Sequence, residues 1–298
     1  MNDRSSSPIP PGLSVWPTGQ RGPLAQLRDT GCEPNTETDS ERIPPAIAAH
    51  VIAAFSRRGD LVVDPDCGAG TVVVAALRAG RHALGLTSRS RWWKLARANV
   101  TAAKAAGAPC EGSVVDARPT MLGTVRAAGL IGQAGLVVTT LRTSTPGPDR
   151  DPVESSVADV AQTLHYCESL LRPGGRVVVL ARPRRHPNGA LADLTTPIVA
   201  AATAARLEPI ERCIALTAEL RGNRLLTHAS LGQRRAAARA DVAGAPAALH
   251  AHIEALVFGI PDESASAAPA VAVAARPQEH RVLRSAIGVG DSGRLRAA

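Results

Sequence analysis

Aromatic side chains are almost missing from this sequence. It has two Phe, one Tyr and three Trp in 298 residues, although hydrophobic residues make up 45% of it. The core must therefore be aliphatic, built from Ala, Val and Leu, and the chain is long enough for one large α/β domain. Long apolar runs are missing too: none approaches a membrane span, and the N-terminus lacks the apolar centre of a signal peptide. We expect a cytoplasmic protein that has no membrane partner.

Cysteine pairs are also lacking. The five cysteines are scattered, odd in number and without a C-x-x-C pair: Cys32, Cys67, Cys110, Cys167 and Cys213. This pattern argues against a zinc site or a disulfide framework and for a reducing compartment. Alternation places His250, His252 and Glu254 on one face of an expected strand, but no fourth ligand stands at a suitable spacing. We therefore expect no bound metal.

Lysine is nearly absent, because Lys94 and Lys104 are the only two lysines among 34 basic residues. The net charge is nevertheless +8. Such an excess admits a polyanionic partner, DNA among them. A composition rich in Arg and Ala and poor in Lys equally fits a coding bias toward G and C. Charge alone leaves both interpretations open.

The two ends of the chain differ from its middle. Residues 1–31 are rich in Pro, Ser and Gly, and residues 262–298 are rich in Ala, Pro and Arg without a period. Compositions of this kind are typical of disorder, so we expect two disordered tails. The folded domain is then expected to span residues 32–261.

Within that domain, short β-branched runs alternate with Ala-rich helical stretches. Strands are expected at 61–65, 82–87, 112–117, 135–140 and 175–181, with two more near 209–217 and 253–258. Helices are expected near 70–79, 89–106, 119–128, 154–171 and 190–206. Nearly continuous apolar strands separated by helices predict a doubly wound, mostly parallel sheet with helices on both faces. Ligands of such sheets bind at the carboxyl ends of the strands.

The strongest local signal is the glycine loop in 61-LVVDPDCGAGTVVVAALRAG-80. A hydrophobic strand ends at Asp64, a Gly68-x-Gly70 turn follows, and a helix opens at Thr71. Glycines let the backbone approach a ligand, and a helix N-terminus presents free N–H groups. A dinucleotide fingerprint would need Gly or Ala where Val73 stands, and no P-loop Gly-Lys-Ser/Thr follows.

The sequence from Asp64 to Thr71, DPDCGAGT, resembles the Asp-Pro-Phe-Cys-Gly-Ser-Gly-Thr motif of S-adenosylmethionine-dependent DNA amino-methyltransferases. Those enzymes methylate amino groups of adenine or cytosine. The resemblance runs in order over residues 42–261, through stretches similar to the family's proline-containing helix and its second, fifth and last strands: 42–65, 81–100, 171–183 and 250–261. It implies a Rossmann-like methyltransferase fold and S-adenosylmethionine as the cofactor.

The resemblance also implies a set of cofactor-binding residues. Asp64 would orient the methionine end of the cofactor, and Gly68 and Gly70 would keep side chains away from it. Asp116 is similar to the acid that binds the adenine amino group, although a helix N-cap is an equal alternative for it. The full set is Asp64, Pro65, Cys67, Gly68, Gly70, Thr71, Thr87, Asp116 and Ala117. Thr87 stands where the family usually has an acid for the ribose hydroxyls, and a hydroxyl supplies no bidentate, charge-assisted contact.

The catalytic motif of the family is degraded in this chain. Its fourth strand delivers Ser/Asp/Asn-Pro-Pro-Tyr/Phe, in which the first residue and a proline carbonyl accept hydrogen bonds from the target amine and the aromatic ring stacks on an extruded base. Here Thr140-Leu141-Arg142-Thr143 occupies these positions, and Thr140 is the only catalytic candidate among them. A slipped alignment onto 144–147 restores one proline and no aromatic residue.

Four arginines are candidates for nucleic-acid contacts. Arg142 can stack on a base or hold a phosphate, with a solvated loop arginine as the alternative. Arg182, Arg184 and Arg185 follow the expected strand at 175–181 on the ligand-facing edge, where a phosphate contact and a solvated loop are both open. The stretch at 218–250 is the only one long enough for an added recognition element, so a protein partner is a further candidate source of specificity.

Three functions follow from these observations. The first is an S-adenosylmethionine-dependent methyltransferase acting on amino groups of DNA bases, or less directly on RNA. The second is a non-catalytic relative that binds cofactor or nucleic acid. The third is a methyltransferase for a substrate other than DNA. Because the catalytic tetrapeptide is lost, these three functions differ first in whether the protein transfers a methyl group at all.

Overall fold

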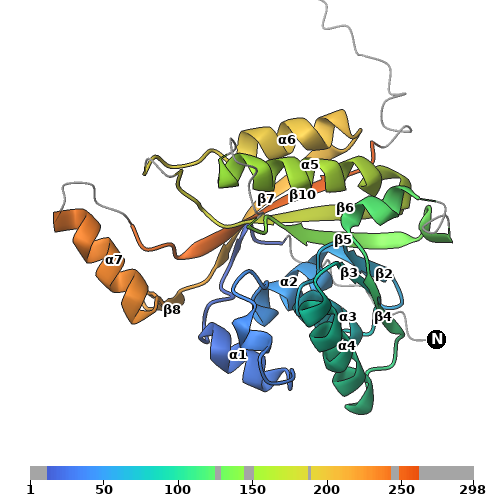
Figure 1. Cartoon of the computed structure of the whole chain (residues 1–298), viewed down its shortest axis with the longest axis horizontal. Coiled ribbons are helices and arrows are strands. Elements are labelled where there is room, and N and C mark those ends of the chain that lie inside the picture. The colour runs from blue at the N-terminus through green and yellow to red at the C-terminus, as the bar shows by residue number, and fades with distance from the viewer. Residues whose placement is uncertain (1–11, 125–128, 144–150, 187–188, 243–247, 262–298) are drawn as a thin grey trace, which may run out of the picture. The chain divides into compact units, whose positions relative to one another are not determined.

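In the computed structural model the described residues are 12–124, 129–143, 151–186, 189–242 and 248–261 (Figure 1). The chain divides into two compact units at Pro261, and all described residues belong to the first of them. The C-terminal tail expected at 262–298 lies outside the described residues.

An eight-stranded sheet with the order β1-β7-β10-β6-β5-β2-β3-β4 forms the centre of the first unit. Its strands are β1 Val15–Trp16, β2 Leu61–Asp64, β3 His82–Thr87, β4 Gly112–Asp116, β5 Ala134–Thr140, β6 Leu171–Ala181, β7 Glu208–Leu216 and β10 His252–Gly259. Neighbouring strands pair in parallel except at β10, which is antiparallel to both β6 and β7. The expected doubly wound, mostly parallel sheet is confirmed.

Helices cover both faces of this sheet. Figure 1 shows α5 and α6 on one face and α2, α3 and α4 on the other. The helices are α1 Pro23–Asp29, α2 Pro45–Phe55, α3 Thr71–Arg78, α4 Ser90–Ala105, α5 Pro152–Leu170, α6 Thr195–Ala204 and α7 Leu231–Val242. Short 3₁₀ turns lie at Thr36–Thr38 and Pro119–Gly123, and a separate hairpin pairs β8 Glu219–Arg221 with β9 Arg224–Leu226. Among the described helices, none is both long and apolar enough to cross a membrane.

The two faces of the sheet have separate aliphatic cores. In β5, Leu136 and Val138 point into the core beneath α2, α3 and α4, whereas Val137 points into the core beneath α5 and α6. Successive strand residues point to opposite faces, so a strand covered on both sides must be apolar throughout. This is why the expected strands read as continuous hydrophobic runs.

Residues 12–31 correct the expectation of a disordered N-terminal tail. They contain β1, which pairs in parallel with β7, and the helix α1. Trp16 is 2% exposed, and the centroid of its ring lies 4.5 Å from the centroid of the His50 ring in α2. One buried indole gives this Pro- and Gly-rich segment an apolar anchor that its composition does not indicate. The helix expected at 119–128 is also wrong in its described part, which is the 3₁₀ turn at Pro119–Gly123.

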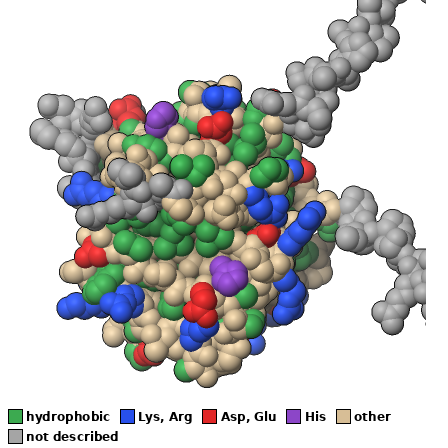
Figure 2. Space-filling model, turned by 90° about the vertical axis from the view of Figure 1, so that its right-hand side faces the viewer, with side chains coloured by type: hydrophobic (Ala, Val, Ile, Leu, Met, Phe, Trp, Pro, Cys, Tyr) green, Lys and Arg blue, Asp and Glu red, His purple; other side chains and the backbone are tan. Residues whose placement is uncertain are grey.

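On the face seen in Figure 2, several Lys and Arg side chains lie along the right-hand edge, and a band of hydrophobic side chains crosses the middle.

Candidate functional site

The glycine loop connects β2 to α3 at the carboxyl edge of the sheet. Gly68 and Gly70 have positive φ angles of 51° and 84°, a backbone conformation that favours glycine. A Cβ on Gly70 would lie 3.0 Å from the Cβ of Ala96 in α4, so the loop and α4 pack closely. The Cys67 N–H donates to the Leu86 carbonyl at 2.8 Å and fixes the loop against β3.

Asp64 is a buried carboxyl group at the end of β2. Asp64 is only 4% exposed, and its Oδ1 atom accepts a hydrogen bond from the Asp66 N–H at 3.3 Å. Burial raises the pKa of Asp64 to about 8, the charge of Arg142 opposes that rise, and the carboxylate of Asp66 adds to it. Asp64 is therefore mostly protonated at neutral pH, and its proton can respond to a cation placed nearby.

The remaining residues of the implied cofactor set lie at neighbouring strand ends. Thr87 is buried at the end of β3 and is in register with Asp116, which is exposed at the end of β4. Ala117 N–H donates to the Thr87 carbonyl at 3.2 Å. Thr71 is buried, and its hydroxyl donates to the Ile43 carbonyl at 3.0 Å. Pro65 and Cys67 are buried within the loop.

Arg142 forms a bidentate ion pair with Asp39. Its Nη1 and Nη2 atoms donate to Asp39 Oδ1 and Oδ2 at 2.9 and 2.8 Å, and its Nε donates to the Asp66 carbonyl at 2.9 Å. The Arg142 side chain is 11% exposed and that of Asp39 is 2% exposed. Arg142 is thus not a solvated loop arginine, the alternative that the sequence left open.

Both partners of this pair are held in their charged forms. Burial alone would raise the pKa of Asp39, but the hydrogen bonds and charge of Arg142, with the N–H of Ala69, bring it below its ordinary value. Burial likewise lowers the pKa of Arg142, and the bonds to Asp39 reverse the direction and raise it. Sequence reasoning missed Asp39, because the run Thr-Asp-Ser-Glu-Arg carries no motif that distinguishes this acid from the acid two residues later.

The Arg142–Asp39 pair packs directly on the glycine loop. A Cβ built on Gly68 would lie 1.8 Å from Arg142 Nη2 and 2.2 Å from Asp39 Oδ2. Asp39 Oδ2 also accepts the Ala69 N–H at 2.9 Å. The pair therefore fills the space beside Gly68 that the family resemblance assigns to the methionine end of the cofactor.

The segment that replaces the catalytic tetrapeptide is tied down by its own side chains. The Thr140 hydroxyl donates to the Leu180 carbonyl of β6 at 2.8 Å, and Leu141 is buried. Thr143 Oγ1 donates to Glu41 Oε1 at 3.0 Å. The hydroxyl proton of Thr140 is committed to the sheet, and a lone pair is what Thr140 can still offer a substrate. The slipped alignment onto 144–147 falls outside the described residues.

Two of the arginines after β6 also hold the segment 39–42. Arg182 Nη1 donates to the Ser40 carbonyl at 3.0 Å, and Nη2 donates to the Arg42 carbonyl. Arg184 Nη2 contacts Glu41 Oε2 at 3.1 Å. Arg185 is exposed and donates to the Gly189 carbonyl at 2.8 Å. Nucleic-acid contacts by these residues stay predictions, and for Arg182 and Arg184 they would require breaking intramolecular bonds.

Metal ligands do not gather at this edge. Within the part of the chain that the structure describes, no group of three His, Cys, Asp or Glu side chains is placed to hold an ion. His250 and His252 instead line a cavity, and Glu254 forms a 2.9 Å ion pair with Arg212.

Comparisons with known proteins locate the family within the first third of the chain. Residues 13–97 match a family model described as DNA methylase. No curated protein gives a match. Many solved structures resemble the chain, and three of them are 12–17% identical to it.

One is precorrin-6y C5,15-methyltransferase from Geobacter metallireducens, 12% identical with a TM-score of 0.48, covering 75% of this chain and 91% of that one. Another is geranyl diphosphate methyltransferase in complex with S-adenosylmethionine, 17% identical with a TM-score of 0.48, covering 84% and 100%. The third is a TehB-like S-adenosylmethionine-dependent methyltransferase from Corynebacterium glutamicum, 14% identical with a TM-score of 0.42, covering 80% and 94%. The family recognised in the glycine loop, that of the DNA amino-methyltransferases, is thus confirmed over residues 13–97.

Proposed function

We propose that this protein binds S-adenosylmethionine at the glycine loop and does not methylate amino groups of DNA bases through residues 140–143. In this proposal it is a relative of the DNA methylases that keeps the cofactor site and has lost the acceptor site. The observation that carries the proposal is the Arg142–Asp39 ion pair, because it places an arginine of the former catalytic segment on the cofactor loop.

Three features support cofactor binding. Gly68, which has a positive φ angle and no Cβ, lets charged groups lie against the loop, as Arg142 and Asp39 do in the absence of a ligand. Asp64 lies buried at the adjacent strand end, where a cation would favour its ionised form. The loop also falls inside the segment that matches the DNA methylases. When bound, the cofactor supplies a sulfonium group that carries a transferable methyl.

Binding requires the ion pair to open. Asp39 offers Arg142 a carboxylate, which is the same group that the methionine end of the cofactor carries. The planar guanidinium holds either carboxylate in the same bidentate way. Arg142 can therefore receive the cofactor carboxylate once Asp39 releases it, and Asp39 then keeps only the hydrogen bonds from the N–H groups of Glu41 and Ala69.

The acceptor side of the site supports the second half of the proposal. The Thr140 hydroxyl already donates to Leu180, and Leu141 is buried in the core beneath α5. Neither proline of the family's tetrapeptide is present, and Thr143 has no ring to stack on a base. Without these groups an extruded base would have no aromatic platform, and only the remaining lone pair of the Thr140 hydroxyl could accept a hydrogen bond from its amino group.

The test has two steps. Calorimetry measures S-adenosylmethionine binding to the full chain and to Asp64→Ala, and a labelled-methyl assay then measures transfer to mixed DNA and RNA. We expect binding to the full chain, weaker binding to the variant, and no transfer to DNA amino groups. Absence of binding to the full chain would overturn the cofactor half of the proposal, and methylated adenine or cytosine would overturn the acceptor half.

A double variant that keeps Arg142 tests whether the segment 140–143 is what prevents transfer. It carries Leu141→Pro and Thr143→Tyr, and Thr143→Ser is its control. Methyl transfer to DNA by the double variant, without transfer by wild type or by the control, would support the proposal. A double variant that binds the cofactor and stays inert would show that these two positions are not what prevents transfer.

A further inference from the structure

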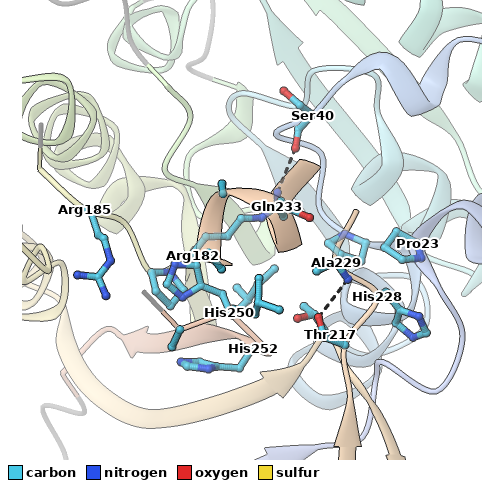
Figure 3. A pocket seen from close by; sticks show the side chains of 18 of the residues that line it. Pro23, Ser40, Arg182, Arg185, Thr217, His228, Ala229, Gln233, His250 and His252 are labelled. Carbon is cyan, nitrogen blue, oxygen red and sulfur yellow. Dashed lines mark hydrogen bonds between the residues drawn. The ribbon is translucent and has the colours of Figure 1, made fainter. Parts of the chain in front are cut away.

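A cavity of about 500 Å³ lies at the other half of the carboxyl edge, away from the glycine loop (Figure 3). The segment 40–44, the end of β6 and the start of β10 contribute to its wall, and the segment 227–237 closes the opposite side. In Figure 3 the side chains of Arg182, Arg185, His250 and His252 lie on one side, across from His228 and Thr217. The volume is within the range of small-molecule sites, about 300–1,000 Å³.

The wall of this cavity is basic and partly apolar. Its titratable side chains are Arg42, Arg182, Arg185, His228, His250 and His252, and none of the described residues that line it is Asp or Glu. Its apolar part includes three prolines, four alanines, Leu249 and Ile253. A concave, basic surface without a counter-charge favours an anion.

Some of the basic groups maintain the wall and others remain available. Arg182 is bound to the carbonyls of the segment 39–42, and His228 Nε2 lies 2.9 Å from the Gly19 carbonyl. The side chains of His250 and His252, by contrast, make no hydrogen bond to a described residue, and Arg185 donates to the Gly189 carbonyl but forms no ion pair with a described acid. Burial lowers the pKa of His250, and the charges of His252 and Arg185 lower it further, so these three groups lie close together.

A second cavity of about 550 Å³ adjoins the first one. Both are lined by Arg185, His250 and His252, which therefore stand between them. The second cavity also contains the carboxyl groups of Asp193 and Glu254, which would repel an anion. The first cavity is the one whose charge suits an anionic ligand.

We propose that this first cavity binds a phosphorylated small molecule, with the phosphate at Arg185, His250 and His252 and the organic part against Leu249 and Ile253. The guanidinium and imidazole N–H groups match the oxygens of a phosphate, and the apolar wall covers the rest of the ligand. This inference goes beyond the proposed function, because none of its residues belongs to the cofactor site.

The experiment uses phenyl phosphate as the probe and phenol as its uncharged match, with ligand-observed NMR on the full chain and no cofactor present. We expect phenyl phosphate to bind at least tenfold more tightly than phenol. Arg185→Gln and His252→Gln should each weaken phenyl phosphate binding about tenfold. Arg239→Gln removes the same charge from α7 outside the cavity and should leave binding unchanged.

Two results would overturn the inference. One is equal affinity for phenyl phosphate and phenol. The other is an equal loss in Arg239→Gln and Arg185→Gln, which would mean that net charge alone attracts the probe. Asp64→Ala, which alters the cofactor site, should bind phenyl phosphate normally. If Asp64→Ala loses phenyl phosphate binding, the probe binds at the glycine loop instead. The test does not depend on S-adenosylmethionine, so a failure of cofactor binding would leave it unaffected.

Discussion

Arg142 holds Asp39 across 103 residues of sequence, with both carboxylate oxygens within 2.9 Å of its Nη atoms. The pair joins the end of β5 to the segment that precedes α2, and it lies on the loop between β2 and α3. Three parts of the chain are thereby fixed at one point, so a change at either residue should affect both stability and ligand binding.

Asp39→Asn removes one of the two charges. An amide cannot hold the guanidinium as a carboxylate does, and it leaves the largely buried Arg142 with only the longer, 3.7 Å ion pair to Asp66. We expect the free energy of unfolding to fall by about 3 kcal/mol, measured by urea denaturation. S-adenosylmethionine should bind several-fold more tightly in calorimetry, because Asp39 no longer competes for Arg142.

The control for this variant is Asp29→Asn. Asp29 pairs with Arg21 at 3.2 Å, but both side chains are about half exposed or more. Its loss should lower stability by at most about 1 kcal/mol and leave cofactor affinity unchanged. Weaker cofactor binding by folded Asp39→Asn would instead make Asp39 a part of the binding site.

Arg142→Gln directly tests the proposal that Arg142 binds the carboxylate of the cofactor. We expect the affinity for S-adenosylmethionine to fall about tenfold, which corresponds to ~1.4 kcal/mol. Methylthioadenosine keeps the nucleoside, has a neutral thioether in place of the sulfonium, and lacks the amino-acid end with its carboxylate, so its affinity should be the same for both proteins. Equal losses for the two ligands would contradict a carboxylate contact and indicate a general disturbance of the loop.

Asp64 should lose its proton when the cofactor binds at pH 7. Its pKa of about 8 keeps it mostly protonated, and the positive charges of S-adenosylmethionine favour the ionised form. Calorimetry in phosphate and in Tris, which differ in ionisation enthalpy, measures the proton released. S-adenosylhomocysteine lacks the sulfonium charge and should release less, and Asp64→Asn should release none. An equal release by wild type and Asp64→Asn would assign the proton to another group.

The same residue should make stability depend on pH. The pKa of Asp64 rises from 3.8 to about 8 on folding, so between these values the folded state binds more protons than the unfolded state. The contribution of Asp64 to the free energy of unfolding is therefore fully present below pH 4 and is lost as the pH rises toward 8. Urea denaturation between pH 5 and 8 should show a smaller decline for Asp64→Asn than for wild type.

Gly68→Ala should lower stability and cofactor binding by more than the positive φ angle of Gly68 alone explains. The added methyl would overlap Arg142 Nη2, so the ion pair must move or the loop must shift. Gly107→Ala is a matched control, because Gly107 also has a positive φ but open space around its Cβ position. We expect Gly107→Ala to cost about 1 kcal/mol and Gly68→Ala distinctly more, with loss of cofactor binding. Equal costs in urea denaturation would show that the contact with Arg142 contributes nothing.

The sheet and the glycine loop could be predicted because their signals are local. Each buried strand is a continuous apolar run, and the turn after Asp64 needs glycines whatever surrounds it. The Asp39–Arg142 pair has no local signal, since two charges far apart in sequence meet only after β2 and β5 have paired. The same reason explains why the sequence could not exclude a solvated position for Arg142.

Other differences have different causes. β1 has two residues, which is too short for any alternation to appear, and its position depends on the burial of Trp16. Composition favoured disorder there because Pro and Gly are frequent in tails and in tight turns alike. At Pro119–Gly123, the proline suits the first turn of a helix, but the chain continues only as a short 3₁₀ turn.

The position of β1 has a practical consequence for anyone who shortens this chain. Val15 and Trp16 pair with Ile214 and Ala215, so they satisfy backbone groups on the outer side of β7. Removing the first 31 residues would leave those donors and acceptors unpaired beside the apolar surface that Trp16 covers. Such a molecule would offer a second copy a strand to add to, and its aggregation would say nothing about the cofactor site.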